Sequence, residues 1–540
     1  MKRHLIIIMG FLVLSLALVS CTEPQVPGNS EVKIEDEEPA IGGQLNIGSV
    51  EPNSFNPIIN KNKSYIGVSS LIFNGLFEYD ENQKVVPVLA KEINIVAESG
   101  QGIIKLRDDV FWSDGSKLTA SDVKSTLDTI KANPNSIYKD NVAKISNYQV
   151  IDEETIKVNF SRPYGNATEQ LCFPIISKQV FYLNENLMPL GTGPYKVSSY
   201  KKLKYMELVP NELWWKKEKP YISKIKVVFI NDINAFDTCF QLREIDMLHA
   251  SSYDWEKYKE LKEVNTYKYI SNGFEYISIN HQNPLLMNKE IRKAMMYGIN
   301  RKAIADKFLL GHAILTDTPV KPDSWLDDSN GVKYNYSKAE AQYILNNAGF
   351  SYNNQAKVFE REIDNKKQVL RLSLITNSEN EYRRKAAEGV KKNLEEAGFI
   401  IDLKIMPFED VKRAMESKKY DLVLTGFNMV SSQDLYAFLH SSQIAGGKNY
   451  GSYSNSDMDI IFDSISDNAN ESLKRINYIK IQEIIREDLP LISMFYKEYA
   501  LVIRNKVKGD IKPDSENPFR TIEKWYIYEP KFDETLNQQD

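Results

Sequence analysis

The spacing of hydrophobic and polar residues predicts strands through most of the first half of the chain. Residues 42–50, GGQLNIGSV, alternate between apolar and polar side chains as a half-buried strand does. Glycines at its start, and Pro52 and Pro57 after it, set the limits of this segment. Strand patterns occupy four further segments, residues 102–107, 155–160, 204–209 and 224–230.

A helix is expected among these strands. Thr119 stands three residues before Asp122, which is the spacing of a capping box at the start of a helix. Val123, Leu127 and Ile130 follow at helical spacing and would lie on one face. The first half of the chain is therefore predicted to be rich in strands, with at least one amphipathic helix.

Strands and helices alternate regularly in the second half. Ser378 and Glu381 have the spacing of another capping box, and Gly398 is placed to end the helix that they open. Such a βαβαβ alternation favours a parallel or mixed sheet with helices on its faces, so the fold class is α/β. The strands are expected at residues 370–376, 400–406 and 421–425, and the helices at residues 378–398 and 408–417.

The first twenty residues have the pattern of a targeting segment. Lys2, Arg3 and His4 make a basic start, and residues 5–19 are almost entirely apolar. This run is short for a membrane-spanning helix and has the size of the apolar part of a secretory signal. It ends at Ser20-Cys21, which resembles a bacterial lipobox and predicts Cys21 as the lipidated N-terminus. The alternative is an ordinary secretory signal in which the cysteine falls at this place by chance.

Composition narrows the class of protein. Residues 21–40 contain three prolines and the acidic cluster 35–38, which is typical of a solvated tether between a lipid anchor and a fold. The remaining chain is long enough for two or three domains. A net charge of −5 gives no footprint for nucleic acid. Cys172 and Cys239 are too few for a disulfide framework and are expected to be free or buried thiols, although they could pair outside the cell.

No catalytic or metal-binding motif is found. The five histidines are scattered, with no His-x-x-x-His or Cys-x-x-Cys spacing, and no Gly-x-Ser-x-Gly or phosphate-binding glycine loop is present. The glycine-rich segment 191–194 contains a proline, so it is interpreted as a rigid turn. Binding without catalysis, cofactor or metal is therefore the expected activity.

Taken together, a series of short motifs resembles one family, the peptide- and nickel-type (family 5) solute-binding proteins of ABC importers. The resemblance runs from about Gly42 to about Lys508 and depends on the order and spacing of the motifs, since no single one is decisive. They are LIFNGLFEYD (71–80), VPVLA (86–90), LR (106–107), FWSDG (111–115), LTASDV (118–123), GTGPY (191–195), NELWW (211–215), KPY (219–221), IRKA (291–294), INR (299–301), YDL (420–422) and YGSYSN (450–455).

The resemblance implies a bilobed fold of the class II type known from periplasmic binding proteins. Three domains would be present, with a hinge and a buried cleft between the lobes. The expected divisions are a signal peptide (1–20), a lipidated cysteine and tether (21–40), a discontinuous domain I (41–64, 192–279 and 500–540), an extra domain II (65–191) and a domain III that forms the second lobe (280–499).

The resemblance also implies positions for the ligand. Tyr138 matches a tyrosine of the cleft, and the loop at residues 60–65, with Lys61 and Lys63, matches a segment that lines the site. Phe427 falls where the family often has a tryptophan after a glycine. The segment that follows it adds three further candidates, Asn428, Met429 and Ser431.

The chain departs from the family pattern just after Phe427. Peptide binders commonly have an aspartate here that pairs with the α-ammonium group of the peptide, but this chain has Val430 or Ser431, depending on a one-residue gap. Asp434 lies a few residues further on. Either Asp434 has taken over the ammonium group, or the ligand has no conventional free N-terminus; as a third reading, Asp434 only caps a loop.

The expected function is that of a lipid-anchored, extracytoplasmic and monomeric binding protein that passes short peptides to the permease and ATPase subunits of an ABC importer. Within the same role, the ligand could be a nickel chelate, haem, a sugar or an opine. Two other classes stay open. One is a lipoprotein that delivers peptides to a sensor, and the other is a secreted hydrolase, for which the sequence supplies no motif.

Overall fold

The structure is a computed structural model that describes residues 38–96, 99–161, 166–178, 189–251, 255–429, 433–468 and 470–528. Residues from Pro39 onward form one compact unit. The predicted signal peptide, the lipidation site Cys21 and the candidate ligand residue Ser431 lie outside the described residues. We call residues 39–263 and 505–528 the first lobe and residues 280–490 the second lobe; two long strands join them.

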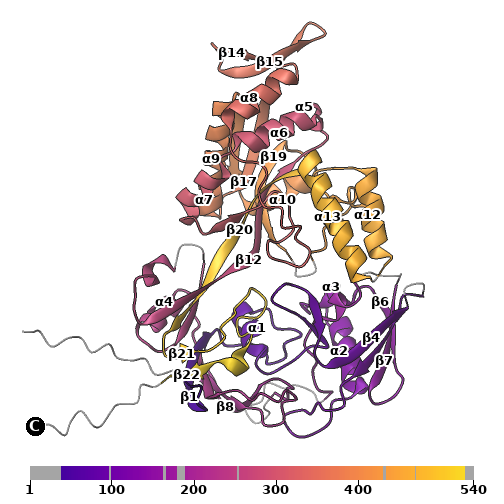
Figure 1. The fold of residues 1–540 in the computed structure, drawn as a ribbon, viewed down its shortest axis with the longest axis vertical. Helices are drawn as coiled ribbons and strands as arrows, with labels where there is room; N and C mark the ends of the chain where they lie inside the picture. Colours follow the sequence, from indigo (N-terminus) through magenta and orange to yellow (C-terminus); the bar gives the residue numbers. More distant parts are fainter. Residues whose placement is uncertain are drawn as a thin grey trace, which may run out of the picture. The chain divides into compact units, whose positions relative to one another are not determined.

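Two four-stranded sheets form the frame of the first lobe (Figure 1). In the first sheet, the order is β1-β10-β9-β8, and β1 is parallel to β10 while the other pairs are antiparallel. In the second sheet, the order is β4-β5-β7-β6. The bounds are β1 Gly42–Ser49, β4 Ala90–Val96, β5 Gln101–Leu106, β6 Ile145–Val150, β7 Thr155–Phe160, β8 Tyr195–Lys201, β9 Tyr205–Pro210 and β10 Ile222–Phe229, so all five strands predicted here are confirmed.

The predicted helix after Thr119 is confirmed as α2 (Ala120–Ala132). The carboxylate of Asp122 accepts hydrogen bonds from the backbone N–H and the hydroxyl of Thr119, at 3.0 and 2.9 Å. The three side chains predicted for one face, those of Val123, Leu127 and Ile130, are fully buried in the main core of the lobe. The spacing therefore identified both the start of the helix and its buried face.

The glycine-rich turn at residues 191–194 packs directly against the backbone of Ile72. A Cβ atom on Gly191 would lie 1.8 Å from the Ile72 carbonyl oxygen, and one on Gly193 would lie 2.6 Å from the Ile72 carbonyl carbon. The Gly193 N–H donates to that carbonyl oxygen at 2.8 Å. Only glycine fits at these two positions, because the two backbone segments are in contact.

Short elements complete the first lobe. They are α1 Lys63–Ser69, β2 Phe77–Tyr79, β3 Val85–Pro87, α3 Lys139–Val142, η2 Glu169–Leu171, α4 Ala235–Gln241, β11 Met247–Ala250, η3 Glu256–Tyr258, β21 Val507–Lys508, η5 Ile522–Lys524 and β22 Tyr526–Ile527. The last three belong to a C-terminal segment whose Ile511, Phe519 and Trp525 are buried in the core of the lobe. The described part of the chain thus begins and ends in the first lobe.

The two connecting strands are β12 (Val264–Ile279) and β20 (Leu491–Arg504), which pair antiparallel along their length (Figure 1). Their register shifts between Ile270 and Phe274, so that residues 271–273 of β12 form a bulge. Beyond the bulge, β12 also pairs with β19 (Leu422–Asn428). The bulge therefore stands where β12 passes from a strand with one partner to a strand with two.

The second lobe contains the predicted βαβαβ unit. The sheet order is β11-β20-β12-β19-β17-β18, and β17 (Arg371–Asn377) is parallel to both β18 (Ile400–Met406) and β19. The connecting helices are α9 (Glu381–Ala397) and α10 (Phe408–Glu416). The mixed sheet with helical connections confirms the α/β fold class.

One detail of this unit was predicted wrongly. The N-cap of α9 is Asn380, whose side chain accepts a hydrogen bond from the Arg383 N–H at 3.0 Å, and not Ser378. Asn380 precedes the first helical residue directly, whereas Ser378 still belongs to the loop after β17. The predicted helix end is confirmed, because Gly398 adopts φ of +104° as the C-cap.

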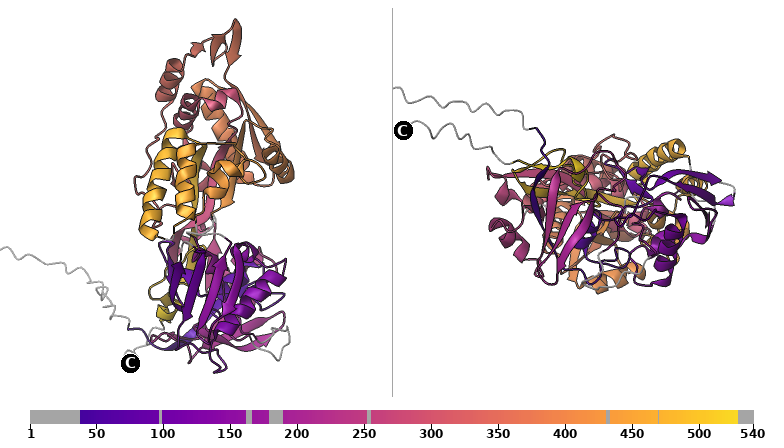
Figure 2. Two further views of the ribbon diagram at one scale, coloured as in Figure 1. Left: turned by 90° about the vertical axis from the view of Figure 1, so that its right-hand side faces the viewer. Right: turned by 90° about the horizontal axis from the view of Figure 1, so that it is seen from below.

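Helices cover both faces of this sheet (Figure 2). One face packs against α6 to α9, and the other against α12 and α13, which lie side by side. The remaining bounds are α5 Pro284–Met287, α6 Lys289–Gly298, α7 Arg301–Leu309, β13 Ala313–Leu315, α8 Lys338–Asn347, β14 Ser351–Asn353, β15 Val358–Ile363, β16 Lys366–Val369, α11 Tyr436–Leu439, η4 Ser441–Gln443, α12 Ser456–Ser466 and α13 Glu471–Asp488.

Candidate ligand-binding site

A polar cavity of about 480 Å³ lies beside the bulge of β12 and is bounded by both lobes. Consecutive residues 266–270 of β12 line it, which places the cavity along the edge of the strand. Within the described residues, this part of β12 pairs only with β20, because β19 ends opposite Gly273. The other walls come from the first-lobe turn Glu81 and Gln83, from residues 321–324 of the second lobe, and from residues 511–514 and Arg520 of the C-terminal segment.

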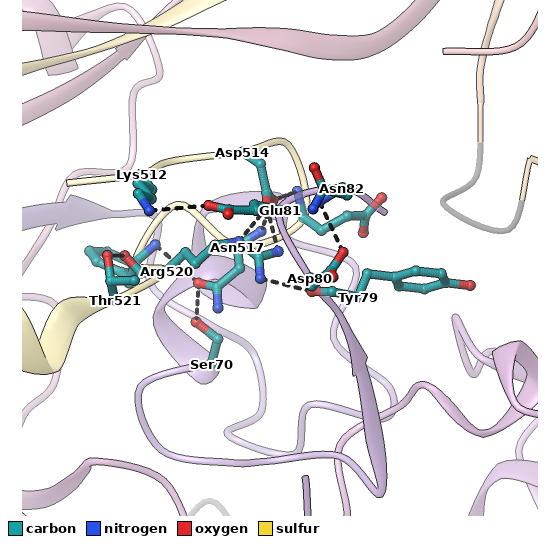
Figure 3. Close-up of polar contacts among 12 residues, drawn as sticks. Ser70, Tyr79, Asp80, Glu81, Asn82, Lys512, Asp514, Asn517, Arg520 and Thr521 are labelled. Carbon is teal, nitrogen blue, oxygen red and sulfur yellow. Dashed lines mark hydrogen bonds and ion pairs between the residues drawn. The ribbon is translucent and has the colours of Figure 1, made fainter. Parts of the chain in front are cut away.

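The first-lobe wall of the cavity is held by paired charges (Figure 3). Lys512 forms an ion pair with Glu81 at 3.2 Å. Arg520 donates to the Asp514 carboxylate at 2.7 Å and to the Tyr79 carbonyl oxygen at 2.8 Å. These contacts fix the C-terminal segment to the turn at residues 79–82, and they leave the charges of this wall largely neutralised.

Two polar side chains of the cavity stand apart from these pairs. Lys321 is 6% exposed and donates to the Asn272 side-chain oxygen at 3.0 Å. Burial lowers the pKa of Lys321. The negative charges of Asp514 and Glu516 nearby act in the opposite direction and cancel part of this lowering. Gln83 is 4% exposed, and its side-chain oxygen has no hydrogen-bond partner among the described residues.

An aromatic group surrounds Phe427 on the second lobe. Its ring stacks on Phe438 with centroids 4.4 Å apart and an interplanar angle of 11°. Phe274 and Tyr276 meet it edge-on at 5.5 and 5.4 Å. A narrow hollow lined by Phe427, Phe438 and Tyr450 runs along this group. Phe427 is half-buried, so its ring serves the core and also borders an accessible surface.

The residues after Phe427 occupy different environments. Asn428 is exposed, whereas Met429 is buried in the core and donates its backbone N–H to the Asn272 carbonyl oxygen at 2.7 Å. Asp434 is half-buried and accepts a hydrogen bond from the Tyr436 N–H at 3.1 Å, just before α11. This contact is the loop cap that was one of the readings of Asp434.

The other candidate residues lie on the first lobe. Tyr138 is half-buried beside Phe173, with ring centroids 6.1 Å apart, and burial together with the charge of Glu516 raises its pKa. Lys61 and Lys63 are exposed at the start of α1. The structure thus places Phe427 and Tyr138 on different lobes, and no candidate residue within its described part lines the polar cavity beside β12.

A buried ion cluster next to Phe427 was not predicted. Glu275 is 2% exposed and binds Arg383 through two hydrogen bonds of 2.9 Å and Lys497 at 2.9 Å. Burial raises the pKa of Glu275, but Lys497 and Arg383 outweigh it and hold that pKa below its ordinary value. Gly426 faces the cluster, since a Cβ atom there would lie 2.8 Å from the Glu275 carboxylate.

Apart from Gly426, no signal along the chain pointed to that cluster. Glu275 and Arg383 are separated by 108 positions, and each is one of many charged residues. Gly426 gave the only hint, because a glycine inside a strand often marks a close approach.

Elsewhere in the described ranges, no group of three or more His, Cys, Asp or Glu side chains could hold a metal ion. Cys172 and Cys239 are both free thiols. Among the helices that the structure describes, none is both long and apolar enough to span a membrane.

Comparison with known proteins adds the following. Residues 84–449 match the profile of the bacterial extracellular solute-binding proteins, family 5 Middle. The oligopeptide-binding protein AppA of Bacillus subtilis is 26% identical, over 97% of this chain and 99% of its own length.

Two solved structures share the fold. The structure of AppA from Bacillus subtilis in complex with a nonapeptide has a TM-score of 0.63 at 23% identity, over 91% of this chain and all of that one. The nickel ABC transporter protein from Bacillus halodurans has a TM-score of 0.77 at 19% identity, over 88% of this chain and 98% of that one.

Proposed function

The chain belongs to family 5 of the bacterial extracellular solute-binding proteins, and from this premise we propose that it is the substrate-binding component of an ABC importer that captures short peptides between its lobes. The observation that carries the proposal is the cavity beside β12, whose walls come from both lobes and from the strand that joins them. A ligand that fills such a cavity contacts both lobes at once and favours their closure. A relative that matches along nearly its whole length is an oligopeptide-binding protein.

The free edge of β12 supports a peptide as the ligand. Residues 266–270 have β20 on one side and the cavity on the other. An extended peptide can hydrogen-bond to such an edge through its main chain. Because the main chain is the same in every peptide, such an edge can bind peptides of many different sequences. The half-buried rings of Phe427 and Tyr138, on opposite lobes, would contact its side chains. Asn428, Met429, Ser431, Lys61 and Lys63 remain further candidates for contact.

The missing acid after Phe427 favours a second candidate, a non-peptide solute taken up in the same way. Position 430 is a valine, and the carboxylate of Asp434 already accepts from the Tyr436 N–H. An ammonium group buried here without a carboxylate would be strongly disfavoured. A nickel chelate or a sugar has no free ammonium group to place, and the nitrogen of an opine is substituted.

The finer parts of the proposal concern location and partners. A lipid at Cys21 would hold the protein at the outer face of the membrane, and residues 22–40 would act as a tether between the lipid and the fold. The closed protein would dock as a monomer on the permease, and nucleotide hydrolysis would belong to the ATPase subunit. The protein itself would carry out no reaction.

A thermal-shift screen tests the proposal. The ligands are defined short peptides, free and N-acetylated, together with sugars and nickel chelates. A ligand that binds only the folded state raises the melting temperature by mass action. A rise with peptides is expected. A rise with a sugar or a chelate, and with no peptide, would replace the peptide assignment by the second candidate.

A further inference from the structure

Lys321 is a buried cation without an ion pair. Its side chain is 6% exposed, and no carboxylate oxygen of the described residues lies within ion-pair distance of its ammonium group. The other cations of the cavity have different surroundings. Lys512 and Arg520 form ion pairs with carboxylates. Lys268 is exposed, and its ammonium nitrogen lies 4.9 Å from the centroid of the Trp255 ring. Lys321 is therefore the lysine of this cavity that is both desolvated and without an ion-pair partner among the described residues.

The ammonium group of Lys321 has N–H donors that are not used in hydrogen bonds to the described residues. An ammonium group has three donors, and one of them goes to the Asn272 side-chain oxygen at 3.0 Å. The nearest acidic side chains are engaged elsewhere, because Asp514 pairs with Arg520 and Glu516 accepts from the Asn272 amide at 2.6 Å. A buried charge that lacks a partner is costly, and an anion in the cavity would remove that cost.

The ammonium group is also held in place. The Lys321 N–H donates to the Gln433 side-chain oxygen at 2.7 Å, and the Gln433 carbonyl oxygen accepts from the Tyr478 hydroxyl at 2.8 Å. Asn272 stands in the bulge of β12, where the Met429 N–H donates to its carbonyl oxygen. A charge fixed in this way is organised for a ligand before binding.

The opposite wall supplies a neutral partner. Gln83 adopts φ of +62° in the turn that follows Asp80, a backbone region that a side chain other than glycine or asparagine rarely occupies. This conformation sets Gln83 against the cavity, where its side-chain oxygen has no partner within the described residues. That oxygen can only accept, so it suits an N–H or O–H group of a bound solute.

We propose that Lys321 seats a carboxylate of the captured solute at the hinge end of the cleft, and that the Gln83 side-chain oxygen accepts from an N–H or O–H group of the same solute. The inference rests on the proposed function and narrows its ligand to an acid. Since Lys321 belongs to the second lobe and Gln83 to the first, a solute bound to both joins the two lobes. The carboxylate can come from the C-terminus of a peptide or from an acidic side chain, because both offer the same acceptor group.

The test is isothermal titration of the purified protein with matched ligands. Each peptide is used with a free C-terminus and as its amide, and with glutamate or glutamine in the chain. Short dicarboxylates and their diamides form a parallel series. Loss of the carboxylate that reaches Lys321 should weaken binding by about 10- to 100-fold, as for a charge-assisted hydrogen bond. Whichever exchange has this effect, at the terminus or in the chain, identifies the source of the carboxylate.

Lys321→Met removes the charge and keeps most of the volume. It should weaken binding of the acid by a similar factor and leave binding of the matching amide unchanged. Lys418→Met is the control, because Lys418 is also partly desolvated, donates to the Ile444 carbonyl oxygen at 2.8 Å and lies outside the cavity. Should Lys321→Met not fold, the comparison of acid and amide on the unaltered protein still decides.

The outcomes separate this inference from the function on which it rests. Peptides that bind equally as acids and amides, with or without Lys321, would overturn the carboxylate site and leave peptide capture standing. Dicarboxylates that need Lys321, where no peptide binds, would keep the site and overturn the peptide assignment. Binding of neither series would overturn both.

Discussion

Lys474 of α13 and Glu169 of η2 form an ion pair that joins the second lobe to the first. The side chains are 5% and 8% exposed. A second ion pair between the lobes, Lys84–Glu471, is about half exposed on both sides. A buried pair loses much more than an exposed one when a single partner is removed, because the other charge is left without compensation.

Replacement of Lys474 should therefore shift the lobes toward separation rather than unfold either of them. Separation lets water reach Glu169, so Lys474→Met is expected to lower ligand affinity by about tenfold or more through the smaller closed population. The double variant Glu169→Gln with Lys474→Met should recover part of that loss. Lys84→Met is the matched control, with an effect below about fivefold. Equal effects of the two lysine variants in titration calorimetry would show that burial of the pair does not matter.

The ion cluster at Glu275 predicts a dependence of stability on pH. The folded protein holds the pKa of Glu275 below its ordinary value of 4.5, so the stabilisation is complete above that value and is lost as the pH falls through the folded-state pKa. Glu275→Gln should cost about 3 kcal/mol in the free energy of unfolding at neutral pH, since Arg383 and Lys497 lose their shared partner.

Urea unfolding from about pH 7 to about pH 3 measures this effect. The difference between the Glu275→Gln variant and the unaltered protein should shrink toward the acid end. Glu212→Gln, which removes the carboxylate of the exposed pair with Lys196, should leave stability unchanged. A pH-independent difference for Glu275→Gln would contradict the assigned charge state.

Gly426 is expected to tolerate no larger side chain. A Cβ atom there would lie 2.8 Å from both the Glu275 carboxylate and the Phe274 carbonyl oxygen, and the latter belongs to the backbone and cannot move aside. Gly426→Ala should lower the free energy of unfolding by about 1–3 kcal/mol. In Gly102→Ala, the new atom would meet nothing closer than 3.6 Å, and thermal unfolding should show no loss. Similar losses for both variants would refute the steric argument.

Asp434 allows its two roles to be told apart. Asparagine keeps the oxygen that accepts from the Tyr436 N–H but removes the charge, whereas alanine removes both. If Asp434 is only a cap, Asp434→Ala should cost about 0.5–2 kcal/mol of stability, and Asp434→Asn should alter neither stability nor affinity. Weaker binding of free, but not N-acetylated, peptides by Asp434→Asn would instead identify the carboxylate as the ammonium partner.

The sequence predicted the regular parts of this fold well. The capping box at Thr119 and the βαβαβ unit depend on contacts within a few residues or on a regular period, and both were found. The part of β12 before its bulge was not predicted as a strand. From Asn265 to Ile270 its side chains are half-buried or exposed without alternation, so no regular period is present there.

The candidate site was much less predictable. Lys321 and Asn272 are 49 positions apart, and Glu169 and Lys474 are 305 apart. Such pairs arise only when separate segments pack together, and isolated charged residues carry no sign of it. The aromatic positions Phe427 and Tyr138 came from resemblance to a family, and their part in ligand binding stays a prediction.

The central claim is that the two lobes close around a bound short peptide. Small-angle X-ray scattering measures that closure directly. The radius of gyration of the purified protein should fall when a peptide that raises the melting temperature is added to saturation. The fall should be smaller with Lys474→Met at the same subsaturating peptide concentration. An unchanged radius with the peptide bound would contradict capture between the lobes.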